Sequence, residues 1–86
     1  MPAYDIIFKP SVEKDLRSLP KSVIDRVLKQ INSLTLDPLP RQTIKLTGAE
    51  HLYRIRVGDY RVVYEVNTKE KRITIHHIRH RRDIYR

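Results

Sequence analysis

The segment Tyr53-Arg-Ile-Arg-Val-Gly-Asp-Tyr-Arg-Val-Val-Tyr64 has the pattern of two short strands joined by a tight turn. Both halves alternate with a period of two residues and are rich in β-branched and aromatic side chains, which favour strands. Gly58-Asp59 places a glycine first, as a two-residue type II′ turn prefers. Such a turn sets the strand register, so that Arg56 faces Arg61. The segment therefore predicts a β-hairpin.

The alternation gives this hairpin two different faces. The apolar face, predicted to join the core, carries Tyr53, Ile55, Val57, Tyr60, Val62 and Tyr64. The other face carries Val63 and three arginines, Arg54, Arg56 and Arg61. Like charges directly opposite each other on paired strands destabilise a sheet. A bound anion, with phosphate as the first candidate, explains three clustered arginines better than a solvated sheet face does.

The composition indicates one small, basic domain over residues 1–86. Its 18 Lys and Arg against 10 Asp and Glu give a formal net charge of +8. This balance favours a polyanionic partner, with nucleic acid first and an acidic protein second. The absence of cysteine excludes disulfides and thiolate chemistry. The chain shows no signal-peptide pattern and no apolar run of membrane-spanning length, so we expect a cytoplasmic protein without a membrane partner.

Two helices are predicted before the hairpin. Ser11 is a candidate cap for a short first helix, which ends at Leu19-Pro20 because the residue before a proline avoids the helical region. Apolar residues then recur at helical spacing from Val23 to Leu34, which predicts a longer second helix. Two helices joined by a tight proline turn form an αα-hairpin. We expect the second helix to pack on the apolar face of the β-hairpin.

Further strands are predicted on either side of these elements. Residues 4–8 alternate as a strand, residues 44–46 form a short extended segment, and residues 72–79 form the last strand. Regular alternation along the last strand puts Ile75 on one face and Ile78 on the other. The expected fold class is α+β, with the αα-hairpin packed on one face of a mainly antiparallel four-stranded sheet.

Several residues near the C-terminus have both a structural and a functional interpretation. His80 lies among arginines, which disfavour its charged form, so it is either a neutral acid–base group or a surface residue. Tyr85 either stacks on a base, acts as a phenol activated by the arginines, or anchors the C-terminus. His76 and His77 are expected on opposite faces of a strand, so no metal site is predicted. With two glycines in the chain, no phosphate-loop motif exists and no cofactor is predicted.

The hairpin sequence, followed by Ile78-Arg-His-Arg-Arg-Asp-Ile-Tyr85, resembles the RelE/ParE superfamily of bacterial and archaeal toxins. The opening from Lys9 to Pro20 resembles it too, so the likeness covers essentially the whole chain. It implies a RelE-like fold and a toxin of a type II toxin–antitoxin system, neutralised by a cognate antitoxin protein. RelE-like members are endoribonucleases that cleave mRNA in the ribosomal A site, next to ribosomal RNA. ParE-like members share the fold and instead poison DNA gyrase.

The resemblance also implies roles for individual residues. The catalytic set would be Arg56, Arg61, Arg81 and Tyr85, with Arg79 replacing Arg81 if the tail is aligned without a gap. The RNA-binding set would be Arg54, Arg79, His80 and Arg82. The best-known RelE pattern has lysines where this chain has Arg54 and Arg56. Arginine does not easily give up a proton, so the general base moves to Tyr85, with His80 second.

The presence of the full set of basic residues with a late tyrosine favours the ribonuclease. Its expected reaction is attack of a ribose 2′-hydroxyl on the adjacent phosphate, which inhibits translation. The alternative is a non-catalytic ParE-like toxin that binds and poisons DNA gyrase.

Overall fold

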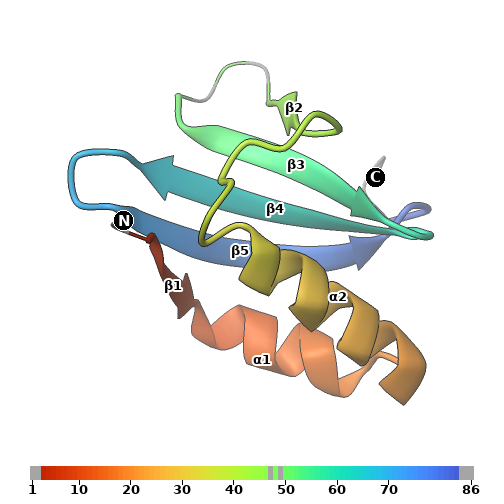
Figure 1. Ribbon diagram of the computed structural model, residues 1–86. Coiled ribbons are helices and arrows are strands. Elements are labelled where there is room, and N and C mark those ends of the chain that lie inside the picture. Colours follow the sequence, from red (N-terminus) through yellow and green to blue (C-terminus); the bar gives the residue numbers. More distant parts are fainter. Residues whose placement is uncertain (1–2, 47, 49, 84–86) are drawn as a thin grey trace.

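The computed structural model describes residues 3–46, 48 and 50–83 and contains two helices and five strands within them (Figure 1). No helix in this described part of the chain is long and apolar enough to cross a membrane. In chain order the elements are β1 (Asp5–Phe8), α1 (Pro10–Arg17), α2 (Lys21–Ser33), β2 (Ile44–Lys45), β3 (Leu52–Val57), β4 (Tyr60–Asn67) and β5 (Arg72–His80).

The five strands form one mixed sheet in the order β1-β5-β4-β3-β2. The prediction of a four-stranded sheet was therefore wrong. β2 adds a fifth strand, since Ile44 pairs with Arg54 of β3. β1 pairs with β5 in parallel, and every other pairing is antiparallel. A strand of two residues is too short to show periodicity, and the β1–β5 pairing joins segments far apart in the sequence.

The β3–β4 hairpin has the predicted register. Arg56 faces Arg61, and Ile55 faces Val62. Gly58 has a φ of 60°, the left-handed conformation that the first central residue of a type II′ turn requires. Since the register follows from the turn, the hairpin sequence was sufficient to predict which side chains share a face.

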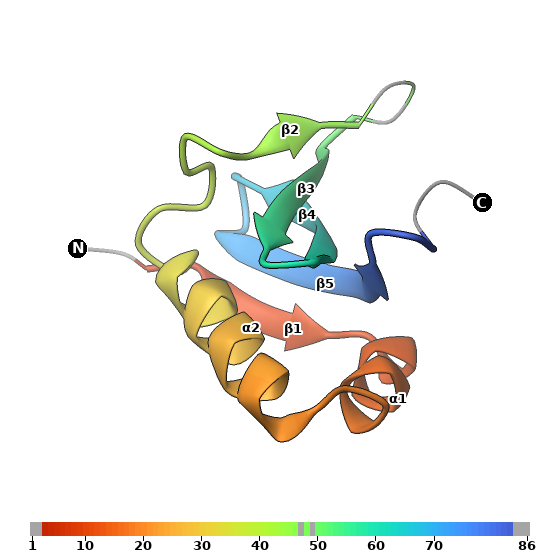
Figure 2. The same ribbon diagram turned by 90° about the vertical axis from the view of Figure 1, so that its right-hand side faces the viewer.

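The core lies between α2 and the sheet, as Figure 2 shows from the side. α2 contributes Val27 and Ile31, which cluster with Ile55, Val62 and Tyr64 of the hairpin. The predicted packing of the second helix on the apolar face of the hairpin is therefore confirmed. Tyr64 is fully buried, and its hydroxyl donates a hydrogen bond of 2.7 Å to the carbonyl oxygen of Pro38. That bond holds the segment between α2 and β2 against the sheet.

A β-bulge interrupts β5 at His76. Val63 of β4 faces His77, but the next residue, Tyr64, faces Ile75, so His76 is an extra residue that no residue of β4 faces in the strand pairing. The extra residue shifts the alternation by one position. Ile75 and Ile78 are consequently both buried in the same core cluster. The prediction that these two isoleucines lie on opposite faces was wrong, because regular alternation takes no account of a bulge.

α1 runs along the edge of β5 beyond the end of β1. β1 pairs with β5 only as far as Ile75, so beyond this residue β5 has no neighbouring strand on the side opposite β4. Side chains of α1 take the place of that strand. The Ser11 hydroxyl donates to the carbonyl oxygen of His76 at 3.2 Å, and the Asp15 carboxylate accepts from the N–H of Ile78 at 3.0 Å. Ser11 was predicted to cap the helix, but the helix begins at Pro10 without a side-chain cap.

Candidate functional site

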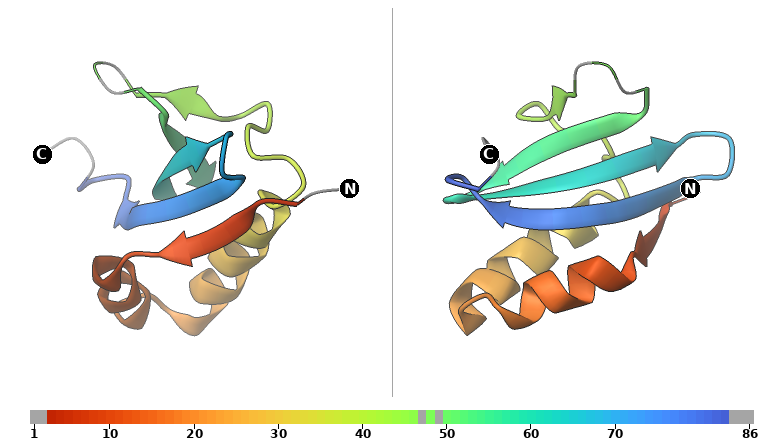
Figure 3. Two further views of the ribbon diagram at one scale, coloured as in Figure 1. Left: turned by 90° about the vertical axis from the view of Figure 1, so that its left-hand side faces the viewer. Right: turned by 180° about the vertical axis from the view of Figure 1, so that it is seen from behind.

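Three arginines form one row across the sheet, on the face turned away from α2. Arg56 of β3 faces Arg61 of β4, and Arg61 in turn faces Arg79 of β5. The three strands that carry the row lie side by side in the view from behind (Figure 3, right). The sequence predicted the first pair. It did not place Arg79 beside them, because that position depends on the bulge in β5.

Arg54 extends this basic surface along β3. Together with Arg56, Arg61, Gln42 and Ile44 it lines a pocket of about 300 Å³. Arg56 is exposed and Arg54 and Arg61 are half-buried. Among the described residues, no carboxylate lies within ion-pair distance of these three arginines. Their guanidinium groups can therefore bind an anion without first breaking a salt bridge.

The carbonyl oxygen of Gly58 partly offsets the repulsion between Arg56 and Arg61. It accepts from Arg56 Nε at 3.1 Å and from Arg61 Nη1 at 3.4 Å. Arg61 Nη1 also donates to the carbonyl oxygen of Tyr60 at 3.1 Å. These neutral acceptors orient the two guanidinium groups but do not cancel their charge. The turn thus supports two adjacent positive charges at one end of the sheet.

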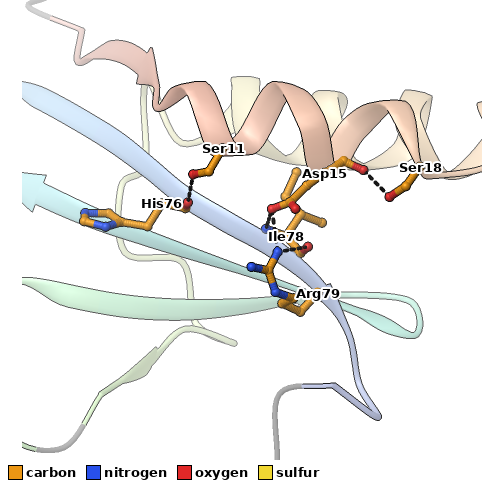
Figure 4. A network of polar contacts seen from close by, with 6 residues as sticks. All are labelled: Ser11, Asp15, Ser18, His76, Ile78 and Arg79. Carbon is orange, nitrogen blue, oxygen red and sulfur yellow. Dashed lines mark hydrogen bonds and ion pairs between the residues drawn. The ribbon is translucent and has the colours of Figure 1, made fainter. Parts of the chain in front are cut away.

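Arg79 has a carboxylate partner. Its Nη1 lies 2.6 Å from Asp15 Oδ2 of α1 and also donates to the carbonyl oxygen of Ile78 at 3.2 Å (Figure 4). The two partners hold the guanidinium at the edge of the sheet where α1 meets β5. The sequence analysis did not single out Asp15. No local signal could have found it, because the two residues of this pair are separated by 64 positions.

His77 lies on the same face as the arginines, in the next cross-strand row. It faces Val63, which in turn faces Arg54. Burial lowers the pKa of His77 below its ordinary value of 6.5, and the positive charge of Arg79 lowers it further. The neutral form is therefore favoured, and His77 adds a proton acceptor to a basic surface. The sequence analysis had treated this residue only as one of two structural histidines.

The segment after β5 brings Arg81 to the hairpin turn. The backbone N–H of Arg81 donates to the carbonyl oxygen of Asp59 at 2.7 Å. Its Nε lies 3.9 Å from Asp59 Oδ1, and both side chains are largely exposed. Arg82 is also exposed, and its backbone N–H donates to His80 Nδ1 at 3.2 Å. Arg81 therefore lies at the end of the hairpin, outside the cross-strand row.

His80 lies on the opposite face of β5 from the arginine row, although it lines one pocket of about 340 Å³ together with Arg79 and Asp15. It pairs with Tyr60, and the two rings meet edge to face with their centroids 5.2 Å apart. Tyr60 packs against the hydrophobic core, so the His80 ring lies on the helix side of the sheet. Tyr85, predicted as the general base, lies outside the described residues. Among the residues that the structure does describe, no group of three or more His, Cys, Asp or Glu could hold a metal ion.

Comparisons with known proteins show the family to which this fold belongs. A family model described as the ParE toxin of the type II toxin–antitoxin system, parDE, matches residues 6–85. Toxin RelE3 of Methanocaldococcus jannaschii is 34% identical in an alignment of length 84 that covers 93% of each chain.

Two solved structures extend the comparison to three dimensions. A chain of the archaeal RelE–RelB complex from Pyrococcus horikoshii OT3 is 42% identical, with a TM-score of 0.83 over 94% of this chain and 97% of that chain. A chain of the toxin–antitoxin complex RelBE2 from Mycobacterium tuberculosis is 25% identical, with a TM-score of 0.79 over 91% and 98% of the two chains. The chain belongs to the RelE/ParE superfamily of toxins of type II toxin–antitoxin systems.

Proposed function

We propose that this toxin is a RelE-like, ribosome-dependent endoribonuclease that cleaves mRNA and so inhibits translation. The observation that carries the proposal is the row formed by Arg56, Arg61 and Arg79 on the open face of the sheet. Attack of a ribose 2′-oxygen on the adjacent phosphate builds negative charge in the transition state. Guanidinium groups suit this task because their fork geometry matches phosphate oxygens and their charge does not titrate away.

The row suggests how the roles are divided. Arg56 and Arg61 would stabilise the charge on the scissile phosphate, and Arg54, beside them in the pocket, would hold a flanking phosphate. Arg79 lies in the row, whereas Arg81 lies at the hairpin turn. Arg79 is therefore the stronger candidate for the late arginine of the catalytic set. Arg81 would contact the RNA beyond the scissile phosphate.

The proton transfers need a separate group, because arginine is a poor general base. Tyr85 is our candidate for the group that takes the proton of the 2′-hydroxyl, and this assignment rests on the sequence alone. His80, the second candidate, packs against Tyr60 on the helix side of the sheet. That placement weakens the case for His80 as the base and for its contact with RNA.

The proposed partners are mRNA in the ribosomal A site, ribosomal RNA and a cognate antitoxin protein. Action on the ribosome would place the chain in the cytoplasm. Solved relatives that are complexes of RelE with RelB support the antitoxin. The charge of +8 favours an acidic segment of that partner. Apolar side chains beside α2 and β1 offer a second kind of contact, at a pocket of about 270 Å³ lined by Ile6, Phe8, Leu28, Ile31 and Asn32.

Primer extension on mRNA from cells that express the chain tests the activity. We expect ribosome-dependent cuts within codons, and we expect Arg61→Ala to abolish them while the protein remains folded. The Arg61 side chain lies on the open face, so its loss leaves the core intact. Intact mRNA together with induction of the DNA-damage response would instead support the gyrase-poisoning alternative. A folded Arg61→Ala protein with full toxicity would overturn the ribonuclease assignment.

A further inference from the structure

Asp15 makes two contacts with β5 through one oxygen atom. Its Oδ2 accepts from the backbone N–H of Ile78 at 3.0 Å and from Arg79 Nη1 at 2.6 Å (Figure 4). The carboxylate is half-buried, with 18% of its side chain exposed, against 41% for Arg79. A partly buried, charge-assisted hydrogen bond is shorter and stronger than one between exposed side chains. This contact therefore restricts the guanidinium of Arg79 more than a surface ion pair would.

The two contacts of Asp15 can be separated by comparison with Ser11. Both residues lie on α1 and bind β5 beyond the end of β1, but Ser11 binds only the carbonyl oxygen of His76. Ser11 thus connects the helix to the strand without touching an arginine. Asp15 also contacts the β5 backbone, by accepting from the N–H of Ile78, and in addition it binds Arg79. A substitution of Asp15 that keeps an acceptor for the Ile78 N–H therefore reports on the guanidinium and not on the docking of α1.

The hydrogen bonds of Arg79 leave part of its guanidinium available. Nη1 is shared between Asp15 and the carbonyl oxygen of Ile78. Within the described residues no hydrogen bond engages Nε or Nη2, which together carry three of the five N–H donors of an arginine. One side of the planar group is therefore fixed to the protein, and the other can still bind an anion. Fixing a flexible cation before its ligand arrives lowers the entropic cost of binding.

We propose that Asp15 is a positioning residue that fixes the guanidinium of Arg79 at the end of the arginine row, where it binds the RNA phosphate. The proposal rests on the ribonuclease function proposed above. The single negative charge of Asp15 does not neutralise the row, because Arg56 and Arg61 have no carboxylate partner among the described residues. Its main effect is to hold one of the three cations in a fixed orientation.

The first test compares Asp15→Asn with Ser11→Ala in the full chain. Asn keeps the size of the side chain and an oxygen that can accept from Ile78, but it loses the charge that holds Arg79. We expect kcat for cleavage of ribosome-bound mRNA to fall roughly 10- to 100-fold in Asp15→Asn, with little change in KM, because misplacement of a catalytic group acts mainly on the chemical step. We expect Ser11→Ala to cleave at close to the wild-type rate. Urea unfolding of both variants gives the fraction that is folded.

The second test does not depend on activity. Side-chain ¹⁵N NMR signals of Arg79 report how freely its guanidinium rotates. We expect resolved, slowly rotating Nη signals in the wild type and in Ser11→Ala, and averaged signals in Asp15→Asn. Unchanged Arg79 signals in Asp15→Asn, or cleavage at the wild-type rate or faster, would overturn the positioning role. Faster cleavage would mean that Asp15 competes with phosphate for Arg79.

The two tests also separate this proposal from the one on which it rests. A wild-type chain that leaves ribosome-bound mRNA intact overturns the ribonuclease function. The NMR comparison then decides by itself whether Asp15 fixes Arg79. Averaged signals in Asp15→Asn alone would still show that the contact with Asp15 restrains the guanidinium. Equal signals in the wild type, Ser11→Ala and Asp15→Asn would show that it does not.

Discussion

Arg56 and Arg61 lie directly opposite each other on the β3–β4 hairpin, and both donate to the carbonyl oxygen of Gly58. The two positive charges repel each other, which destabilises the hairpin. We expect Arg56→Gln to keep the free energy of unfolding unchanged or to raise it by up to about 1 kcal/mol, and to reduce mRNA cleavage. Urea unfolding and the cleavage assay measure the two effects.

Arg41→Gln removes the same charge from an exposed position in the loop before β2 and serves as the control. A loss of stability confined to Arg56→Gln would show that its hydrogen bond outweighs the repulsion.

Tyr64 connects the sheet to the loop before β2 through its hydroxyl. Besides the bond to Pro38, the hydroxyl lies 3.2 Å from Thr43 Oγ1. We expect Tyr64→Phe to lower the free energy of unfolding by about 1–3 kcal/mol, because a partly buried carbonyl group loses its donor. Hydrogen exchange of the loop amides should also become faster.

Tyr53→Phe is the matched control for this change. The Tyr53 ring packs against that of Tyr64, with the centroids 6.1 Å apart, and its hydroxyl bonds no described residue. We expect Tyr53→Phe to have a smaller effect on unfolding than Tyr64→Phe. Equal losses for the two variants would contradict the role of the Tyr64 hydroxyl.

His77 makes stability depend on pH. Burial first, and Arg79 second, lower its pKa in the folded protein below the ordinary value of 6.5. Asp15 acts in the opposite sense, and His76 and Lys9 add smaller contributions to the lowering. As the pH falls below that value, the unfolded chain takes up a proton that the folded protein resists, so the folded state loses stability. Above it the full stability is present.

Urea unfolding of wild type and His77→Gln at pH values on both sides of 6.5 measures this effect. We expect a smaller loss of stability toward acid pH in His77→Gln. His51→Gln, which alters an exposed histidine in the loop before β3, should keep the wild-type slope. Parallel pH profiles for wild type and His77→Gln would exclude His77 as a source of the dependence.

Arg79 and Arg81 should differ in their contributions to cleavage. Arg79 stands in the cross-strand row, whereas Arg81 lies at the hairpin turn beside Asp59. We expect Arg79→Ala to reduce kcat by roughly 100-fold or more, as removal of a group that stabilises the transition state does. We expect Arg81→Ala to act mainly on KM. Single-turnover cleavage of programmed ribosomes separates the two effects, and the reverse order would assign the catalytic role to Arg81.

Tyr85 is expected to transfer a proton. On that basis Tyr85→Phe, which removes only the hydroxyl, should slow the cleavage step by a factor of roughly 10²–10⁴. A tyrosine that only stacks on a base would tolerate this change with little loss. Tyr85→Ala removes stacking as well, so the ratio of the two variants measures the contribution of the ring.

The sequence predicted those parts of the fold that depend on neighbouring residues. Gly58 fixed the turn, and the turn fixed which residues of β3 and β4 share a face. The parallel pairing of β1 with β5 joins distant segments and could not be predicted. Residues 44–46 were predicted to be extended, but a strand of two residues gave no pattern that would add it to the sheet.

The candidate site divides in the same way. Arg56 and Arg61 were predicted together because one hairpin carries both. Arg79 and Asp15 reach the site through the bulge in β5 and the docking of α1, neither of which has a local sequence pattern. His80 follows Arg79 on the strand and therefore lies on the other face of the sheet, where it packs against Tyr60. Its contact with RNA stays a prediction.

The bulge at His76 also determines how the chain tolerates changes of length. Because no residue of β4 faces His76 in the strand pairing, deleting it would turn β5 into a regular strand and leave every later side chain on its present face. Arg79 would still lie beside Arg61. Removal of Thr74 instead would exchange the faces of the residues around it and turn a core isoleucine toward solvent. Among related toxins we therefore expect insertions and deletions of one residue in β5 to occur mainly at this position, because a change of length there leaves the arginine row in place.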